Sequence, residues 1–145
     1  MKSRIRWGRV IVAALFSELA VIAVLMAFTG VYILMTHKTG ADLQQFGAQV
    51  GYYLAPPASG LATFLSALWA TRRLGENIVL TGTLVGVAAV LLTAGFLFGA
   101  KPEDRLMYIV SFAIRIAAGY LGGLTAQARF HRTRAISSPV VGQAG

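Results

Sequence analysis

Three features of the sequence can carry chemistry, and each interrupts a long apolar run. Glu18 and Arg115 are single charges within such runs, and Pro56-Pro57 lies near the middle of another. Charges inside a membrane-spanning segment often mark proton or ion paths, and a broken helix exposes backbone groups to a ligand. The candidate chemistries are proton coupling at Glu18, binding of an anionic substrate or lipid headgroup at Arg115, and a discontinuous-helix site at the prolines.

Each feature also has a structural interpretation. Glu18 and Arg115 can neutralise each other, and proline kinks are readily tolerated in membrane helices. Pro56 and Pro57 leave the backbone carbonyls of Tyr52 and Tyr53 without their helical donors. At 1.5 Å per residue, the axial gap between the two charges is about 9 Å, and the freed carbonyls lie on the far side of the arginine. We therefore predict one intramembrane polar cluster, made of Glu18, Arg115, Tyr52, Tyr53, Pro56 and Pro57.

The composition is that of a membrane protein. Of the 145 residues, 57% are hydrophobic and only 12% are charged, against about 25% charged in an average soluble domain. The charges are concentrated outside four apolar runs, each long enough to cross a bilayer. We predict an all-α, polytopic fold: a single four-helix transmembrane domain over residues 1–134 and a flexible tail over 135–145. The expected helices are about 10–35, 43–70, 78–98 and 105–127.

The two prolines allow two forms of the second helix. It is either one span kinked at Pro56-Pro57 or a short segment that breaks there and restarts at Pro57, since proline suits the first position of a helix. The restarted piece would hold 13 residues, or about 20 Å, which is too short to span the bilayer alone. The kinked span is therefore the favoured form.

The orientation follows from the positions of Lys and Arg. The N-terminus, second turn and C-terminal segment carry four, two and three of them, whereas the first and third turns carry one and two. The positive-inside rule places both termini in the cytoplasm, so we expect a multi-pass protein of the bacterial inner (plasma) membrane. The basic clusters suit anionic lipid at the cytoplasmic face. They form no continuous basic face with stacking aromatics, so no nucleic-acid partner is expected.

Two further patterns concern polar and small residues. Gln45 and Gln49 share a helical stripe with Tyr52 and Pro56, which indicates either an outward-opening polar vestibule or interfacial side chains at a helix end. Glycine pairs four residues apart let helices approach closely, within the bundle or between protomers. The expected helix-packing glycines are Gly82 and Gly86, Gly95 and Gly99, and Gly119 and Gly123.

Catalytic and metal-binding patterns are absent from the sequence. There is no cysteine, the two histidines fall at expected helix ends, and no paired carboxylates or hydrolase motif occur. We therefore expect no enzyme activity, no metal site and no cofactor.

The segment Ala14-Leu15-Phe16-Ser17-Glu18 resembles, in position, the first helix of the small multidrug resistance exporters. Proteins of that family have four short helices and a membrane-embedded glutamate in the first. The double proline, Arg115 and the basic ends depart from the family's pattern, so the similarity implies no membership.

Two functional hypotheses follow. The first is a small integral membrane protein that acts through helix–helix association, as an accessory subunit or a homo-oligomer, with the Glu18–Arg115 cluster buried inside it. The alternative is a small oligomeric transporter or channel that uses Glu18 and the helix break at Pro56-Pro57. Four helices are too few to enclose a pathway, so the alternative requires an assembly of several copies.

Overall fold

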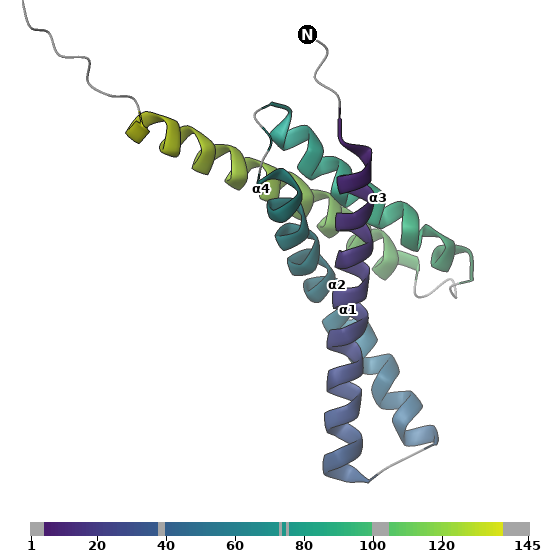
Figure 1. The fold of residues 1–145 in the computed structure, drawn as a ribbon. Helices are drawn as coiled ribbons and strands as arrows, with labels where there is room; N and C mark the ends of the chain where they lie inside the picture. The colour runs from purple at the N-terminus through teal and green to yellow at the C-terminus, as the bar shows by residue number, and fades with distance from the viewer. Residues whose placement is uncertain (1–4, 38–39, 73, 75, 100–104, 138–145) are drawn as a thin grey trace, which may run out of the picture.

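The described part of the chain folds into four α-helices (Figure 1). The computed structural model describes residues 5–37, 40–72, 74, 76–99 and 105–137. The helices are α1 (Trp7–Thr36), α2 (Ala41–Thr71), α3 (Ile78–Gly99) and α4 (Arg105–Ser137). The all-helical prediction is thus confirmed at the level of four helices in the expected order.

Three of the four helices are long and apolar enough to cross a membrane: α1, α3 and α4 up to Arg132. Their composition supports a membrane protein. The second helix, α2, is not among the candidate spans because polar residues and the two prolines dilute its apolar character. Sequence and structure therefore agree on three helices that could span a membrane by length and composition.

Helix α2 runs without interruption across Pro56 and Pro57. Of the two forms considered for this helix, the chain thus adopts the continuous one, and no new helix begins at Pro57. The Ser59 hydroxyl donates a hydrogen bond of 2.9 Å to the carbonyl of Pro56, within the turn that follows the prolines.

The ends of the helices differ from the predicted ones mainly at the C-terminus. Helix α4 continues ten residues past Gln127, through the basic segment 129–134, and ends at Ser137. The first three residues of the predicted tail are therefore helical, and residues 138–145 lie outside the described residues. The apolar run ends near Gln127, but no proline or glycine occurs between Gln127 and Pro139 to stop the helix.

Glycines bring α3 and α4 into close contact. A Cβ added at Gly82 would lie 2.6 Å from the carbonyl oxygen of Gly119, and one added at Gly86 would lie 2.6 Å from the carbonyl oxygen of Arg115. A Cβ added at Gly123 would lie 2.8 Å from the Cα of Val79. These two glycine pairs therefore pack the two helices backbone to backbone.

The third predicted pair behaves differently. A Cβ added at Gly95 or Gly99 would meet nothing within 4 Å among the described residues, so this pair does not mediate helix packing within the chain. Gly122, which belongs to none of the predicted pairs, does make a close contact: its Cβ would lie 2.9 Å from the Cβ of Ala67, between α4 and α2.

The bundle covers only part of the first two helices. All buried residues of α1 fall between Val10 and Val21, and those of α2 between Pro56 and Thr71. Residues 22–36 and 41–55 form a two-helix hairpin, here called the α1–α2 arm, which projects away from α3 and α4 (Figure 1). The rings of Tyr32 and Phe46 stack within it, with centroids 3.7 Å apart.

Candidate functional site: a buried glutamate–arginine cluster

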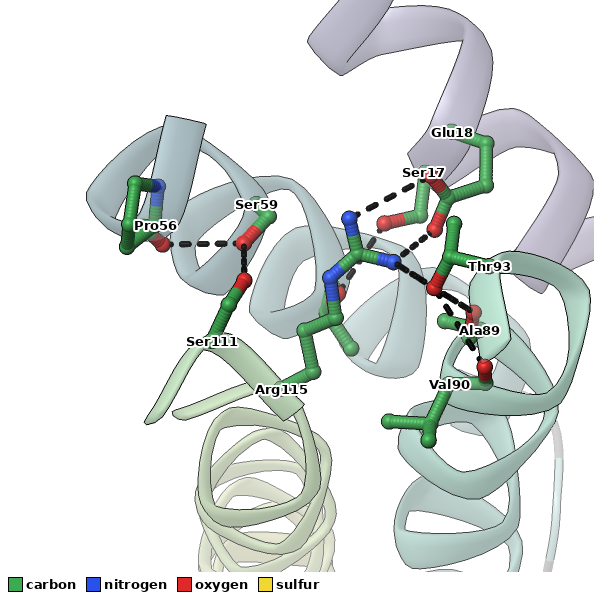
Figure 2. A network of polar contacts seen from close by, with 10 residues as sticks. Ser17, Glu18, Pro56, Ser59, Ala89, Val90, Thr93, Ser111 and Arg115 are labelled. Carbon is green, nitrogen blue, oxygen red and sulfur yellow. Dashed lines mark hydrogen bonds and ion pairs between the residues drawn. The ribbon is translucent and has the colours of Figure 1, made fainter. Parts of the chain in front are cut away.

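Glu18 and Arg115 form an ion pair between α1 and α4 (Figure 2). The Nη1 of Arg115 donates to Oε1 of Glu18, and Nη2 donates to Oε2 at 3.3 Å, so the contact is bidentate. The arginine side chain is 8% exposed and the glutamate side chain 17%. Pairing of this kind, with further hydrogen bonds to the guanidinium, offsets part of the cost of placing the two charges away from water.

Helix α3 supplies the remaining partners of the guanidinium. Nη1 of Arg115 also donates to the hydroxyl of Thr93 at 3.1 Å and to the carbonyl of Ala89 at 3.3 Å. Thr93 itself donates to the same Ala89 carbonyl at 2.9 Å, so its hydroxyl is held in place. The Nε of Arg115 is buried and makes no hydrogen bond within the described part of the chain.

The ion pair links two helices that are not direct neighbours. Among the described residues, no Cα of α1 lies within 8 Å of a Cα of α4, although every other pair of helices is in such contact. The long arginine side chain crosses this distance beside the glycine contact at Gly86, and α3 lines its path. Glu18 and Arg115 therefore connect the first and last helices through side chains.

Small hydroxyl residues surround the pair. Ser17 and Thr63 are hydrogen-bonded to each other at 3.0 Å between α1 and α2, and both are buried. Ser59 and Ser111 are 3.4 Å apart, between α2 and α4 (Figure 2). Each of these contacts pairs polar atoms that would otherwise be costly in an apolar interior.

The predicted cluster is thus only partly assembled. The structure brings together Glu18 and Arg115, and Pro56 lies nearby through its contact with Ser59. Tyr52 and Tyr53 are 48% and 75% exposed, and their rings contact each other edge to face.

The freed carbonyls of α2 are not the acceptors that Arg115 uses. Its acceptors come from α1 and α3, so the contacts expected from the carbonyls of Tyr52 and Tyr53 are not made, and Pro57 is exposed. The glycine contacts between α3 and α4 explain the difference, since they hold α3 directly beside Arg115.

Sequence reasoning missed Thr93 and the carbonyl of Ala89. A signal was available, because α3 is expected over 78–98, with its centre near residue 88. Ala89 and Thr93 lie within about 8 Å of that centre at 1.5 Å per residue, at a depth comparable with Arg115. The same depth argument that paired the two charges could therefore have included the threonine.

The structure places Gln45 and Gln49 together at a polar recess on the arm. This cavity, of about 170 Å³, is lined by Tyr32, Asp42, Gln45, Phe46 and Gln49. Neither Glu18 nor Arg115 lines it. The recess and the ion pair are therefore separate features, one on the arm and one within the bundle.

The chemistry open to the Glu18–Arg115 cluster is limited by its pairing. Both carboxylate oxygens accept hydrogen bonds from the guanidinium, so the geometry is that of a neutralised pair and not of a free acid beside a free base. Within the described residues, no group of three or more potential metal-ligating side chains occurs. Comparisons of the chain with protein-family models, with curated protein sequences and with solved structures find no match.

Proposed function

We propose that this chain is a small multi-pass protein of the bacterial inner (plasma) membrane that acts through helix–helix association, as a homo-oligomer or as an accessory subunit of a membrane complex. All four helices cross the bilayer in this proposal, with both termini in the cytoplasm, as the distribution of Lys and Arg favours. The role is not catalytic.

The observation that carries the proposal is the uncovered polar surface of α2 in the α1–α2 arm. Gln44, Gln45 and Gln49 are exposed there. The Tyr32–Phe46 stack aligns this part of α2 with residues 22–36 of α1, which contain no charged residue. The apolar α1 segment suits hydrocarbon, whereas amide side chains at the same depth are costly unless another polar group pairs with them.

No residue of the arm is buried by the described part of the chain. Lipid can cover its apolar side, but lipid cannot satisfy the amides of Gln44, Gln45 and Gln49. A neighbouring protein surface can, since polar side chains hydrogen-bond between membrane helices. We therefore place the association surface on the arm, with the Glu18–Arg115 pair holding the bundle behind it.

Cysteine crosslinking in native membranes tests the proposal, because the chain contains no cysteine of its own. For a homo-oligomer, Gln49→Cys yields a covalent dimer under mild oxidation. Leu121→Cys, at an exposed residue of α4 outside the arm, does not. Mass measurement in mild detergent accompanies it and detects a foreign subunit. A monomeric mass together with no Gln49→Cys adduct contradicts the proposal.

The polar recess on the arm favours a second candidate, a small oligomeric transporter or channel. Its lining includes an acid, two amides and a tyrosine, which are residues suited to a polar solute. The test is proton flux into vesicles that contain the protein, compared with Asp42→Asn, which removes the acid that lines the recess, and with Glu18→Gln. Flux that is abolished by Asp42→Asn supports transport through the recess, and equal flux in all three proteins excludes both carboxyl groups as carriers.

A further inference from the structure

An apolar groove lies between helices α1 and α2 on the outer surface of the bundle. It has a volume of about 310 Å³ and is lined by Phe16, Leu65, Ser66 and Trp69. Phe16, Leu65 and Trp69 are 68%, 54% and 53% exposed, so the walls of the groove lie at the surface of the bundle. Its size falls in the range of sites that hold small ligands.

The register of the two helices shows where the groove leads. Ser17 and Thr63 are hydrogen-bonded, which aligns them across the antiparallel pair. Trp69 lies six residues past Thr63, or about 9 Å along the axis. Arg9 lies about 12 Å and Arg72 about 13.5 Å from the same level, towards the same end of the hairpin. The two arginines therefore stand just beyond the end of the groove.

Both arginines also share a helical face with the groove walls. Arg72 follows Leu65 and Trp69 at spacings of seven and three residues, which places the three on one stripe of α2. Arg9 precedes Phe16 by seven residues and lies on the corresponding stripe of α1. The groove thus runs between two stripes that each end in a guanidinium.

No described residue neutralises either guanidinium. Arg72 is exposed and Arg9 is half-buried, and within the described residues neither side chain makes an ion pair or a hydrogen bond. Two positive charges that have no partner among the described residues, at the mouth of an apolar groove, complement a molecule with an anionic head and a hydrocarbon tail. Each such charge near an anionic membrane surface attracts it with about 1 kcal/mol.

We propose that the groove is a binding site for an anionic phospholipid, with one acyl chain along Phe16, Leu65 and Trp69 and the phosphate held between Arg9 and Arg72. This site rests on the membrane location proposed above and adds a specific ligand class to it. It involves α1 and α2 at the opposite end from the polar recess, so it is independent of the association surface on the arm.

Native mass spectrometry of the whole chain, released from mixed-lipid nanodiscs, tests the site. The probes are phosphatidylglycerol and phosphatidylcholine with the same acyl chains. The expected result is retention of one phosphatidylglycerol in preference to phosphatidylcholine. Arg72→Gln and Arg9→Gln each weaken that preference about fivefold, equivalent to about 1 kcal/mol. The matched variant Arg132→Gln, at an exposed arginine of α4, leaves it unchanged.

The acyl-chain part of the site has its own pair of variants. Leu65→Ala lowers retention of phosphatidylglycerol, whereas Leu121→Ala, at a side chain that is 53% exposed on α4, does not. Glycerol phosphate, which has the head but no tail, does not displace the bound lipid. Displacement by glycerol phosphate, or equal effects of the two leucine variants, would contradict the proposal that the groove binds an acyl chain.

Other outcomes separate this site from the proposed function. Equal losses in Arg72→Gln and Arg132→Gln would mean diffuse attraction and overturn the site, as would the absence of any preference in a chain that inserts into the nanodisc. A chain that fails to insert would overturn the membrane location and the lipid site together. Circular dichroism of each variant checks that its helices are intact. If Arg9→Gln or Arg72→Gln fails to fold, the other variant still tests the site.

Discussion

The substitution Glu18→Gln tests the ion pair directly. It keeps the shape of the side chain but removes the charge that neutralises Arg115, whose side chain is only 8% exposed. Removing one partner of a buried ion pair costs about 3–5 kcal/mol, because the other charge stays behind without compensation. The amide oxygen that replaces the carboxylate still accepts one hydrogen bond, which returns about 1 kcal/mol. We therefore expect a loss of about 2–4 kcal/mol in the free energy of unfolding.

The double variant Glu18→Gln/Arg115→Gln is the informative comparison. It leaves no unpaired charge, so its cost is smaller than the sum of the two single substitutions by at least about 2 kcal/mol. Unfolding by SDS in mixed micelles, followed by far-ultraviolet circular dichroism, measures all four proteins under the same conditions. Thr93→Val serves as the matched control, since it removes one acceptor of Arg115 but no charge, at a cost of about 0.6 kcal/mol.

If the cost of the double variant equals the sum of the two single costs to within about 0.5 kcal/mol, the ion pair between Glu18 and Arg115 does not stabilise the fold. Glu18 and Arg115 would then contribute independently, and the contact between α1 and α4 would carry no net stability. A cost of Glu18→Gln no larger than that of Thr93→Val would lead to the same conclusion.

Two further substitutions test packing with the same unfolding assay. Gly119→Ala places a Cβ 2.6 Å from the carbonyl of Gly82 and should destabilise the bundle by about 1–3 kcal/mol, while Gly95→Ala, where nothing lies within 4 Å, should cause no loss. Equal effects at the two glycines would argue against the α3–α4 contact. Tyr32→Ala removes the stack with Phe46 and should cost about 0.5–1.5 kcal/mol, and a neutral result would mean that the arm does not depend on it.

Depth within the bilayer was the most informative property of the sequence. It places Glu18 and Arg115 within reach of each other from the lengths of two apolar runs alone, and the structure has them hydrogen-bonded. Depth says nothing, however, about which helices are neighbours around the axis of the bundle. The acceptors expected from Tyr52 and Tyr53 lie at a reachable depth on α2, but α3 occupies the position beside the arginine.

The neighbours of α4 were set by small residues whose partners the sequence does not specify. Three glycine pairs were available, and each alone was equally suited to close packing. Gly82 and Gly86 face α4, whereas Gly95 faces no described part of the chain, and only the fold distinguishes them. The end of α4 was misjudged for a simpler reason: the apolar run stops near Gln127, but a helix ends where a residue breaks it.

The link between α1 and α4 has a consequence for how the protein is made. The two partners are 97 residues apart, and at ordinary rates of protein synthesis the ribosome adds Arg115 about 5–20 s after Glu18. During that interval the first helix has already been synthesised, and its carboxyl group has no guanidinium to meet. Helix α4 therefore supplies the counter-charge of α1 late in synthesis, and a chain truncated before Arg115 would retain a glutamate without the ion-pair partner that it has among the described residues.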